Sequence, residues 1–198
     1  MVLVRFNIKN AKYALETSSG WGAFVPFGYA DSLSLEADYA EKVIYGDGRK
    51  VFTVPNDKGK TGTLSLLTVD DDYEIAMKRK MQTAKGLAEI KQTSSVPHAI
   101  YFETEYIDED GATKTAKTIL YGVTSGRPSQ SYNQTTEDIN NNNTDYSITI
   151  KGVPMKSGEN IYKDASGNEV YVWQETCIPD DAGYATFGTT VVHPSPKS

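Results

Sequence analysis

Polar and apolar residues alternate with a period of two in several parts of the chain. Residues 31–38 place Leu33 and Leu35 on one side, with serine and glutamate side chains on the other. Residues 145–151 repeat this pattern around Ile148. Because successive side chains of a strand point to opposite faces, both segments predict strands of a sheet with one buried face and one wet face.

Two further segments, residues 61–69 and 98–107, contain more apolar residues and predict strands that are covered more deeply. The turn sequence Asp108–Gly111 joins residues 98–107 to a further segment, residues 113–123. Their content of Tyr, Val, Ile and Thr is typical of strands.

An exposed excursion of the chain is predicted between about residues 43 and 60. Asp47-Gly48 is a favoured pair for a tight hairpin turn, here between residues 42–45 and 49–54. Pro55–Gly59 reads as a second loop, because it combines Pro, Asn, Asp and Gly.

One helix is predicted over about residues 71–81. Asp71 and Glu74 have the spacing of a capping box, with Asp71 as the N-cap. One helical stripe would then hold Tyr73, Ala76, Met77 and Met81. The expected fold is mainly β: an antiparallel β-sandwich or partial barrel with one flanking α-helix.

The chain divides by composition into a core and an extension. Residues 1–153 contain the strands and the helix, whereas residues 154–198 are richer in Gly, Pro and turn residues. We expect a C-terminal extension with a strand at about 168–177 and a flexible tail at its end. Residues 125–143 are polar, and we expect them to be either disordered in a free monomer or an irregular strand ordered by neighbours.

Charge and composition exclude several classes of protein. The net charge is −6 and no cluster of Lys and Arg occurs, so a grip on nucleic acid phosphates is not expected. A single cysteine, Cys177, excludes an intrachain disulfide, and we expect a small, partly buried side chain rather than a nucleophile. We find no segment with the length of a membrane span and no signal peptide in residues 1–10, which favours folding in a cytoplasm.

The sequence motifs that carry chemistry are incomplete. Gly59-Lys60-Thr61 resembles the end of a phosphate-binding loop, but position 54 is Val where that motif needs Gly. The acidic turn at 108–111 lacks the Glu that a calcium loop requires, and His98 and His193 have no second ligand at zinc spacing. We therefore expect no enzyme, no metal and no cofactor.

Two segments together resemble the signature of the major tail tube proteins of long-tailed (siphovirus-type) bacteriophages and related prophages. They are Leu120–Ser129, LYGVTSGRPS, and Thr144–Gly152, TDYSITIKG. The order of other segments supports the resemblance. These are Val4–Ile8 and Lys12–Leu15 as an opening strand pair, then residues 32–36, 62–64 and 170–175.

The resemblance implies a structural virion protein that self-assembles into hexameric rings stacked as the phage tail tube. DNA would pass through the channel during ejection without specific binding, and the negative charge would keep it from sticking. The implied partners are further copies of the chain, a tape-measure protein, a tail terminator and distal tail proteins. The implied location is the tail of the virion, with assembly in the host cytoplasm. The strand residues expected to face the lumen are Ser32, Ser34, Glu36, Asp145, Ser147 and Thr149.

A second set of residues is expected at contacts between subunits or between stacked rings. Arg127 leaves a strand before Pro128, and two interpretations stay open: its charge simply meets water, or it reaches a carboxylate on a neighbouring subunit. The complete set of candidates is Tyr45, Asp47, Arg49, Lys58, Lys60 and Arg127.

The alternative function is an extracellular β-sandwich that binds carbohydrate or acts in adhesion. The 13 Tyr and 2 Trp residues would supply stacking surfaces for sugars. An enzyme ranks third, because no nucleophile with its base and no metal set is recognisable.

Overall fold

The computed structural model describes residues 4–18, 20–129 and 143–197. The Asn run at 140–143 therefore lies outside the described residues except for Asn143. Within the described ranges, no helix is long and apolar enough to cross a membrane. The elements are β1 (Val4–Thr17), β2 (Gly20–Trp21), β3 (Val25–Pro26), β4 (Ala30–Gly46), β5 (Arg49–Leu66), α1 (Asp71–Ala76), β6 (Lys80–Thr83), β7 (Gly86–Glu89), β8 (His98–Ile107), β9 (Thr113–Ser125), β10 (Thr144–Ile150), β11 (Val153–Pro154), β12 (Lys156–Ser157), β13 (Asn160–Ile161), β14 (Tyr171–Val172) and β15 (Gln174–Cys177).

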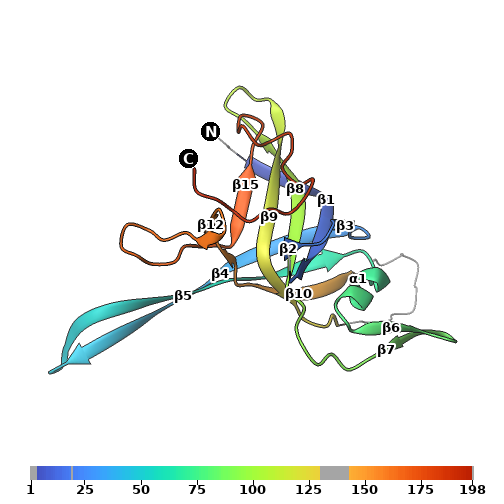
Figure 1. Cartoon of the computed structure of the whole chain (residues 1–198), viewed down its shortest axis with the longest axis horizontal. Coiled ribbons are helices and arrows are strands. Elements are labelled where there is room, and N and C mark those ends of the chain that lie inside the picture. The colour runs from blue at the N-terminus through green and yellow to red at the C-terminus, as the bar shows by residue number, and fades with distance from the viewer. Residues whose placement is uncertain (1–3, 19, 130–142, 198) are drawn as a thin grey trace, which may run out of the picture.

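One antiparallel sheet organises the molecule. Its strand order is β2-β1-β8-β9-β10-β5-β4, with β3 paired to β1 and β15 paired to β9. In Figure 1, β8, β9 and β15 run steeply across the view, whereas β4 and β5 lie nearly horizontally, so the sheet bends strongly at β9 and β10. The sheet does not close on itself. The mainly β, antiparallel, partly barrel-like fold with one flanking helix is confirmed.

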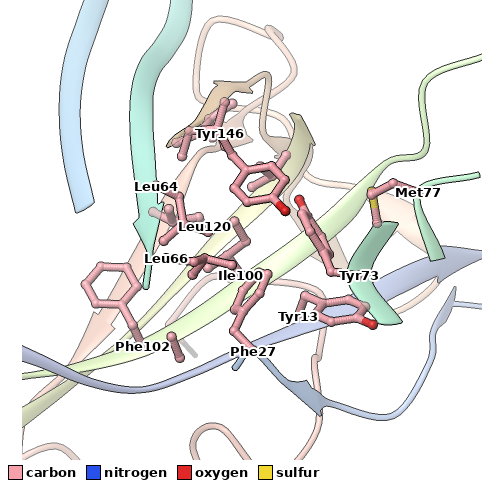
Figure 2. Packing of buried hydrophobic residues seen from close by; sticks show 14 residues of the cluster. Tyr13, Phe27, Leu64, Leu66, Tyr73, Met77, Ile100, Phe102, Leu120 and Tyr146 are labelled. Atoms are coloured by element: carbon pink, nitrogen blue, oxygen red, sulfur yellow. The ribbon is translucent and has the colours of Figure 1, made fainter. Parts of the chain in front are cut away.

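The main core fills the concave side of the bent sheet. Aromatic rings meet around Tyr73 of α1: its centroid lies 4.9 Å from that of Phe27, 5.0 Å from Tyr13 and 5.4 Å from Tyr146. Figure 2 shows these rings beside the aliphatic side chains of β5, β8 and β9. Side chains of this size contribute about 1.5–3 kcal/mol each when fully buried, so the helix is held to the sheet chiefly by Tyr73 and Met77.

A second apolar cluster covers the other face of β1, β8 and β9. Ala99, Tyr101, Ile119 and Tyr121 of the sheet are buried there against Val191 and other residues that follow β10. β15 also pairs antiparallel with β9 over residues 117–120. The residues beyond 153 therefore pack onto the back of the sheet.

The predicted helix is too long and its cap is misplaced by one residue. Asp70, not Asp71, is the N-cap, and its carboxylate accepts the amide of Tyr73 at 3.0 Å. The helix ends at Ala76, and Lys78 then adopts φ 58°, a left-handed conformation that terminates helices. Met81 consequently lies in β6 and is 48% exposed.

The predicted opening strand pair is a single strand, β1. Its pairing with β8 shifts register twice, between Phe6 and Ile8 and between Lys9 and Lys12. Asn7 and Asn10 sit in these shifts with φ of 60° and 53°. Asn adopts the left-handed region more easily than most residues. Asn7 and Asn10 therefore form two bulges within one strand, and no hairpin turn divides it.

The predicted loop at 55–59 is also wrong, because β5 continues through it. Pro55 pairs with Glu41 of β4, and β10 pairs only with residues 60–66 of β5. β10 therefore does not reach Pro55. On that side of β5, the proline, which has no amide hydrogen, breaks no hydrogen bond between strands. The Asp47-Gly48 turn itself is confirmed, with φ of 50° and 73°.

The strand predicted at 168–177 is found in two short pieces. β14 pairs with β11, β15 pairs with β9, and Trp173 lies between them. Gly152 approaches Trp173 so closely that a Cβ on Gly152 would lie 2.4 Å from the indole. The large ring interrupts the strand because it packs inward at this point.

Candidate functional site

A ladder of polar side chains covers the outer face of β4, β5 and β10. We call it the polar face. The pairing places Ser32 beside Ser65 beside Asp145, and the next rows repeat this arrangement two residues along each strand. The rows are Ser32–Ser65–Asp145, Ser34–Thr63–Ser147 and Glu36–Thr61–Thr149.

Polar and apolar residues alternate along each strand, so the polar side chains point away from the core. Leu33, Leu64 and Tyr146 lie between the polar rows and pack into the main core. A slip of one residue would bury hydroxyls and expose leucines, so the register is strongly specified. Gly62 allows β4 and β5 to approach, since a Cβ there would lie 2.0 Å from the carbonyl oxygen of Ser34.

All six residues predicted to face a lumen thus lie together on the polar face. The sequence reasoning missed the middle column, Thr61, Thr63 and Ser65, because residues 61–69 read as a covered strand. The signal was present: Thr, Thr and Ser alternate with Gly and Leu, as in the flanking strands.

The polar face contains hydroxyls and two carboxylates but no Lys or Arg in its three rows. The Ser65 hydroxyl donates to the Asp145 carboxylate. Hydroxyls exchange hydrogen bonds with water at little net gain, and carboxylates repel phosphate. Such a surface stays hydrated and does not retain a polyanion.

The polar face ends at an open sheet edge. In the part of the chain that the structure describes, no strand pairs with the outer side of β4. At the opposite border, β3 and β2 pair with β1 only at residues 12–13 and 16–17, so no described strand pairs with Val4–Asn10 on that side. Each free edge presents backbone donors and acceptors that a strand of another chain can complete.

The distal parts of β4 and β5 form an arm, residues 39–57, that projects from the body (Figure 1). Its large side chains are not covered: Tyr45 is 69% exposed, Val51 60% and Phe52 52%. A two-stranded hairpin is marginal by itself in water. An uncovered apolar arm of this kind marks a contact surface.

The predicted contact residues do not all gather at one place. Tyr45, Asp47 and Arg49 lie at the tip of the arm, and Lys58 is exposed near its base. Lys60 lies on the body, where its ammonium donates to Gln174 Oε1 at 2.9 Å.

Arg127 has a partner within its own chain, which neither interpretation anticipated. Its guanidinium lies 3.0 Å from Glu89 Oε2 and donates to the Ile90 carbonyl oxygen at 2.6 Å. The contact ties the end of β9 to β7.

A buried polar cluster lies behind the polar face. Arg79 is fully buried, forms an ion pair with Glu74 at 2.8 Å and donates to the carbonyl oxygens of Ser125 and Gly126. Its guanidinium also lies over the rings of Tyr73 and Tyr146. In the sequence Arg79 stands between Lys78 and Lys80, and such a run of three cations gives no local sign that the middle one is buried.

His98 belongs to the same cluster. Burial lowers the pKa of His98 to about 4, and the charge of Arg79 acts in the same direction. Its Nδ1 lies 3.0 Å from the carbonyl oxygen of Val96, so this nitrogen donates and Nε2 faces the Tyr73 hydroxyl at 2.9 Å. The imidazole is therefore a neutral structural group.

The described residues give no sign of a metal centre. Among them, no group of three or more His, Cys, Asp or Glu side chains could hold a metal ion. Cys177 is buried and free, and burial raises the pKa of its thiol.

No protein-family model matches the sequence, and a search of curated proteins finds no match either. Function must therefore be inferred from the geometry described above together with the motifs of the chain.

Proposed function

We propose that the chain is a structural, non-enzymatic subunit of a tail tube of a long-tailed bacteriophage or prophage. Copies pair through their free sheet edges into hexameric rings, and the rings stack into a channel for DNA ejection. The observation that carries the proposal is the polar face of β4, β5 and β10, which runs without interruption to an edge of β4 that no other described strand pairs with.

Edge pairing would convert this face into the lining of a channel. If β4 of each copy pairs with a free edge of its neighbour, the polar faces of the copies would be arranged around one central hole. Hydroxyls and the carboxylates of Glu36 and Asp145 would keep that surface wet and would repel DNA, which can then slide through. Tape-measure, tail terminator and distal tail proteins complete the proposed assembly in the virion tail, built in the host cytoplasm.

The arm would connect stacked rings. Its exposed Tyr45, Val51 and Phe52 need a partner surface, and its length carries them away from the body of their own subunit. Its position in the chain agrees with the excursion and the hairpin expected from the sequence, although strand β5 continues through residues 55–59, where a loop was expected.

Cysteine labelling tests the proposed lumen. Ser34→Cys lies in the middle row of the polar face, and Glu159→Cys, on an exposed turn far along the chain, is the matched control. In monomers both variants should react with a small maleimide and with a maleimide on a large polymer. In assembled tubes the Ser34→Cys variant should still react with the small maleimide, but its labelling by the polymer maleimide should be at least tenfold slower than in monomers. The Glu159→Cys variant should react with both reagents as before. If the polymer labels both variants equally in tubes, the polar face does not line the lumen.

One observation favours the alternative, an extracellular carbohydrate-binding or adhesion module. Tyr29 is 73% exposed on the wall of a hollow of about 420 Å³ that is also lined by Lys9, Asn10 and Lys12. The side-chain nitrogens of these three residues already contact Glu105, Glu103 and the ring of Tyr101. An open aromatic ring beside hydrogen-bonding groups suits a sugar. Glycan-array binding that is lost in Tyr29→Ala, by a chain that stays monomeric, would favour this function over the tube.

A further inference from the structure

The arm loses the support of the sheet at one point. β10 pairs with β5 as far as Lys60, opposite Ile150, and beyond that point β4 is the only described strand that pairs with β5. Residues 39–57 therefore continue as a two-stranded hairpin that projects from the body (Figure 1). The direction of the arm depends on the few residues that join it to the body.

A β-bulge lies at this joint. The ladder between β4 and β5 shifts register between Ala37 and Tyr39, so Asp38 alone stands opposite two residues of β5, Lys58 and Gly59. Gly59 has φ 103°, a conformation that residues with a side chain rarely adopt. A bulge interrupts the ladder and bends its strand, so the strand pair is least stiff at this point.

The body side of the joint is held more firmly than the arm side. A Cβ on Gly59 would lie 2.2 Å from the carbonyl oxygen of Ile150, so this residue is packed against β10. The next residue, Lys60, donates to Gln174 Oε1 at 2.9 Å. Towards the arm, the Gly59 amide donates to Asp57 Oδ1 at a longer distance, 3.2 Å. Bending is therefore confined to the bulge itself.

The bulge also reverses the two sides of β5. On the body, Thr63 of β5 shares the polar face with Ser34 of β4. The extra residue in the bulge changes the alternation, so Phe52 lies on this same side in the arm, opposite Ile44. Phe52 and Val54 are 52% and 42% exposed there. The side that is polar on the body is apolar on the arm, and the angle at the bulge decides where it points.

We propose that the bulge formed by Asp38, Lys58 and Gly59 is a hinge, about which the arm pivots as one stiff hairpin. Hinges concentrate a motion in a few residues at the ends of elements, on a scale of microseconds to milliseconds. In the free chain the arm samples a range of directions, and a surface that binds its apolar side selects one of them. The hinge belongs to the single chain and does not depend on assembly into a tube.

Spin-label distances test the hinge. Cys177 is buried, so introduced thiols take the labels. In the dilute chain, Arg49→Cys at the tip with Glu159→Cys on the body should give a distance distribution about twice as wide as that of the body pair Asp110→Cys with Glu159→Cys. Glu41→Cys with Arg49→Cys, both on the arm, should be as narrow as the body pair. A narrow tip-to-body distribution, or a broad one within the arm, would overturn the proposal.

Removing the bulge supplies an independent test. Deletion of Lys58 leaves Asp38 opposite Gly59 alone and makes the ladder regular, so the tip-to-body distribution should narrow to the width of the body pair. Lys58→Ala keeps the bulge and should keep the native width. A folded deletion variant whose distribution stays as wide as the native one would also overturn the proposal. Should the deletion prevent folding, the three label pairs in the otherwise native chain decide.

Discussion

Arg79 and Glu74 form an ion pair that water does not reach. Their side chains are 0% and 3% exposed, and their charged atoms lie 2.8 Å apart. Removing two charges from water is costly, and the cost is offset here by mutual attraction and by the hydrogen bonds from Arg79 to the end of β9. This pair therefore fixes the helix segment against the C-terminal end of β9.

Breaking that pair should destabilise the protein strongly. Arg79→Met leaves the carboxylate of Glu74 buried without a cation, so we expect a loss of about 3–5 kcal/mol in the free energy of unfolding. Chemical denaturation measures this loss, and Lys78→Met, an exposed neighbour, should lose less than about 0.5 kcal/mol. The double variant Arg79→Met, Glu74→Leu should recover most of the loss. A double variant as unstable as Arg79→Met alone would contradict the assignment.

His98 should make stability depend on pH. The folded pKa is about 4, below the usual 6.5, so between these values the unfolded state binds more protons than the folded one. Stability due to this residue is therefore complete above about pH 6.5 and is lost as the pH falls toward 4. A shift of this size corresponds to about 3 kcal/mol.

Comparison with His98→Gln isolates this contribution from that of the carboxylates. Urea denaturation at several pH values should show a steeper loss of stability below pH 6.5 in the native chain than in the variant. Identical slopes in both proteins would show that His98 does not titrate in the folded cluster as described.

At the scale of elements, sequence alternation was a good guide wherever one face of a strand is wet. The polar and buried sides of β4 and β10 are as predicted. The strand predicted at 98–107 from its apolar content, not from alternation, is β8 itself. The predictions that were wrong concern segments whose structure depends on residues far away in the sequence. β5 continues through Pro55–Gly59 because β4 pairs with it, and the helix stops early because Arg79 is drawn into the core. Neither partner is visible in a local window of sequence.

The arm should be removable without loss of the fold. Its large side chains are exposed, so replacing residues 41–55 with Asn-Gly should shift the melting temperature by only a few degrees. Electron microscopy should then show rings or monomers but no long tubes. Long tubes from the shortened chain would contradict the role of the arm, and the native chain assembled under the same conditions is the control.

At the scale of the whole molecule, the open sheet is the feature that needs explanation. A bent sheet with a free outer strand, an uncovered arm and a polar face would be an aggregation risk in a monomer. Sequence predicted the two outer columns of the polar face, on β4 and β10, since their residues alternate locally, but it missed the middle column on β5. It could not predict which strands are neighbours or which edges stay unpaired, because both depend on pairings between segments far apart in the chain.

Electron microscopy of the concentrated, purified chain tests the central claim most directly. Completion of one copy's sheet edge by the next predicts sixfold rings and stacked tubes with a continuous central channel. A chain that remains monodisperse and monomeric at every concentration, with its outer strand left unpaired, would contradict this account.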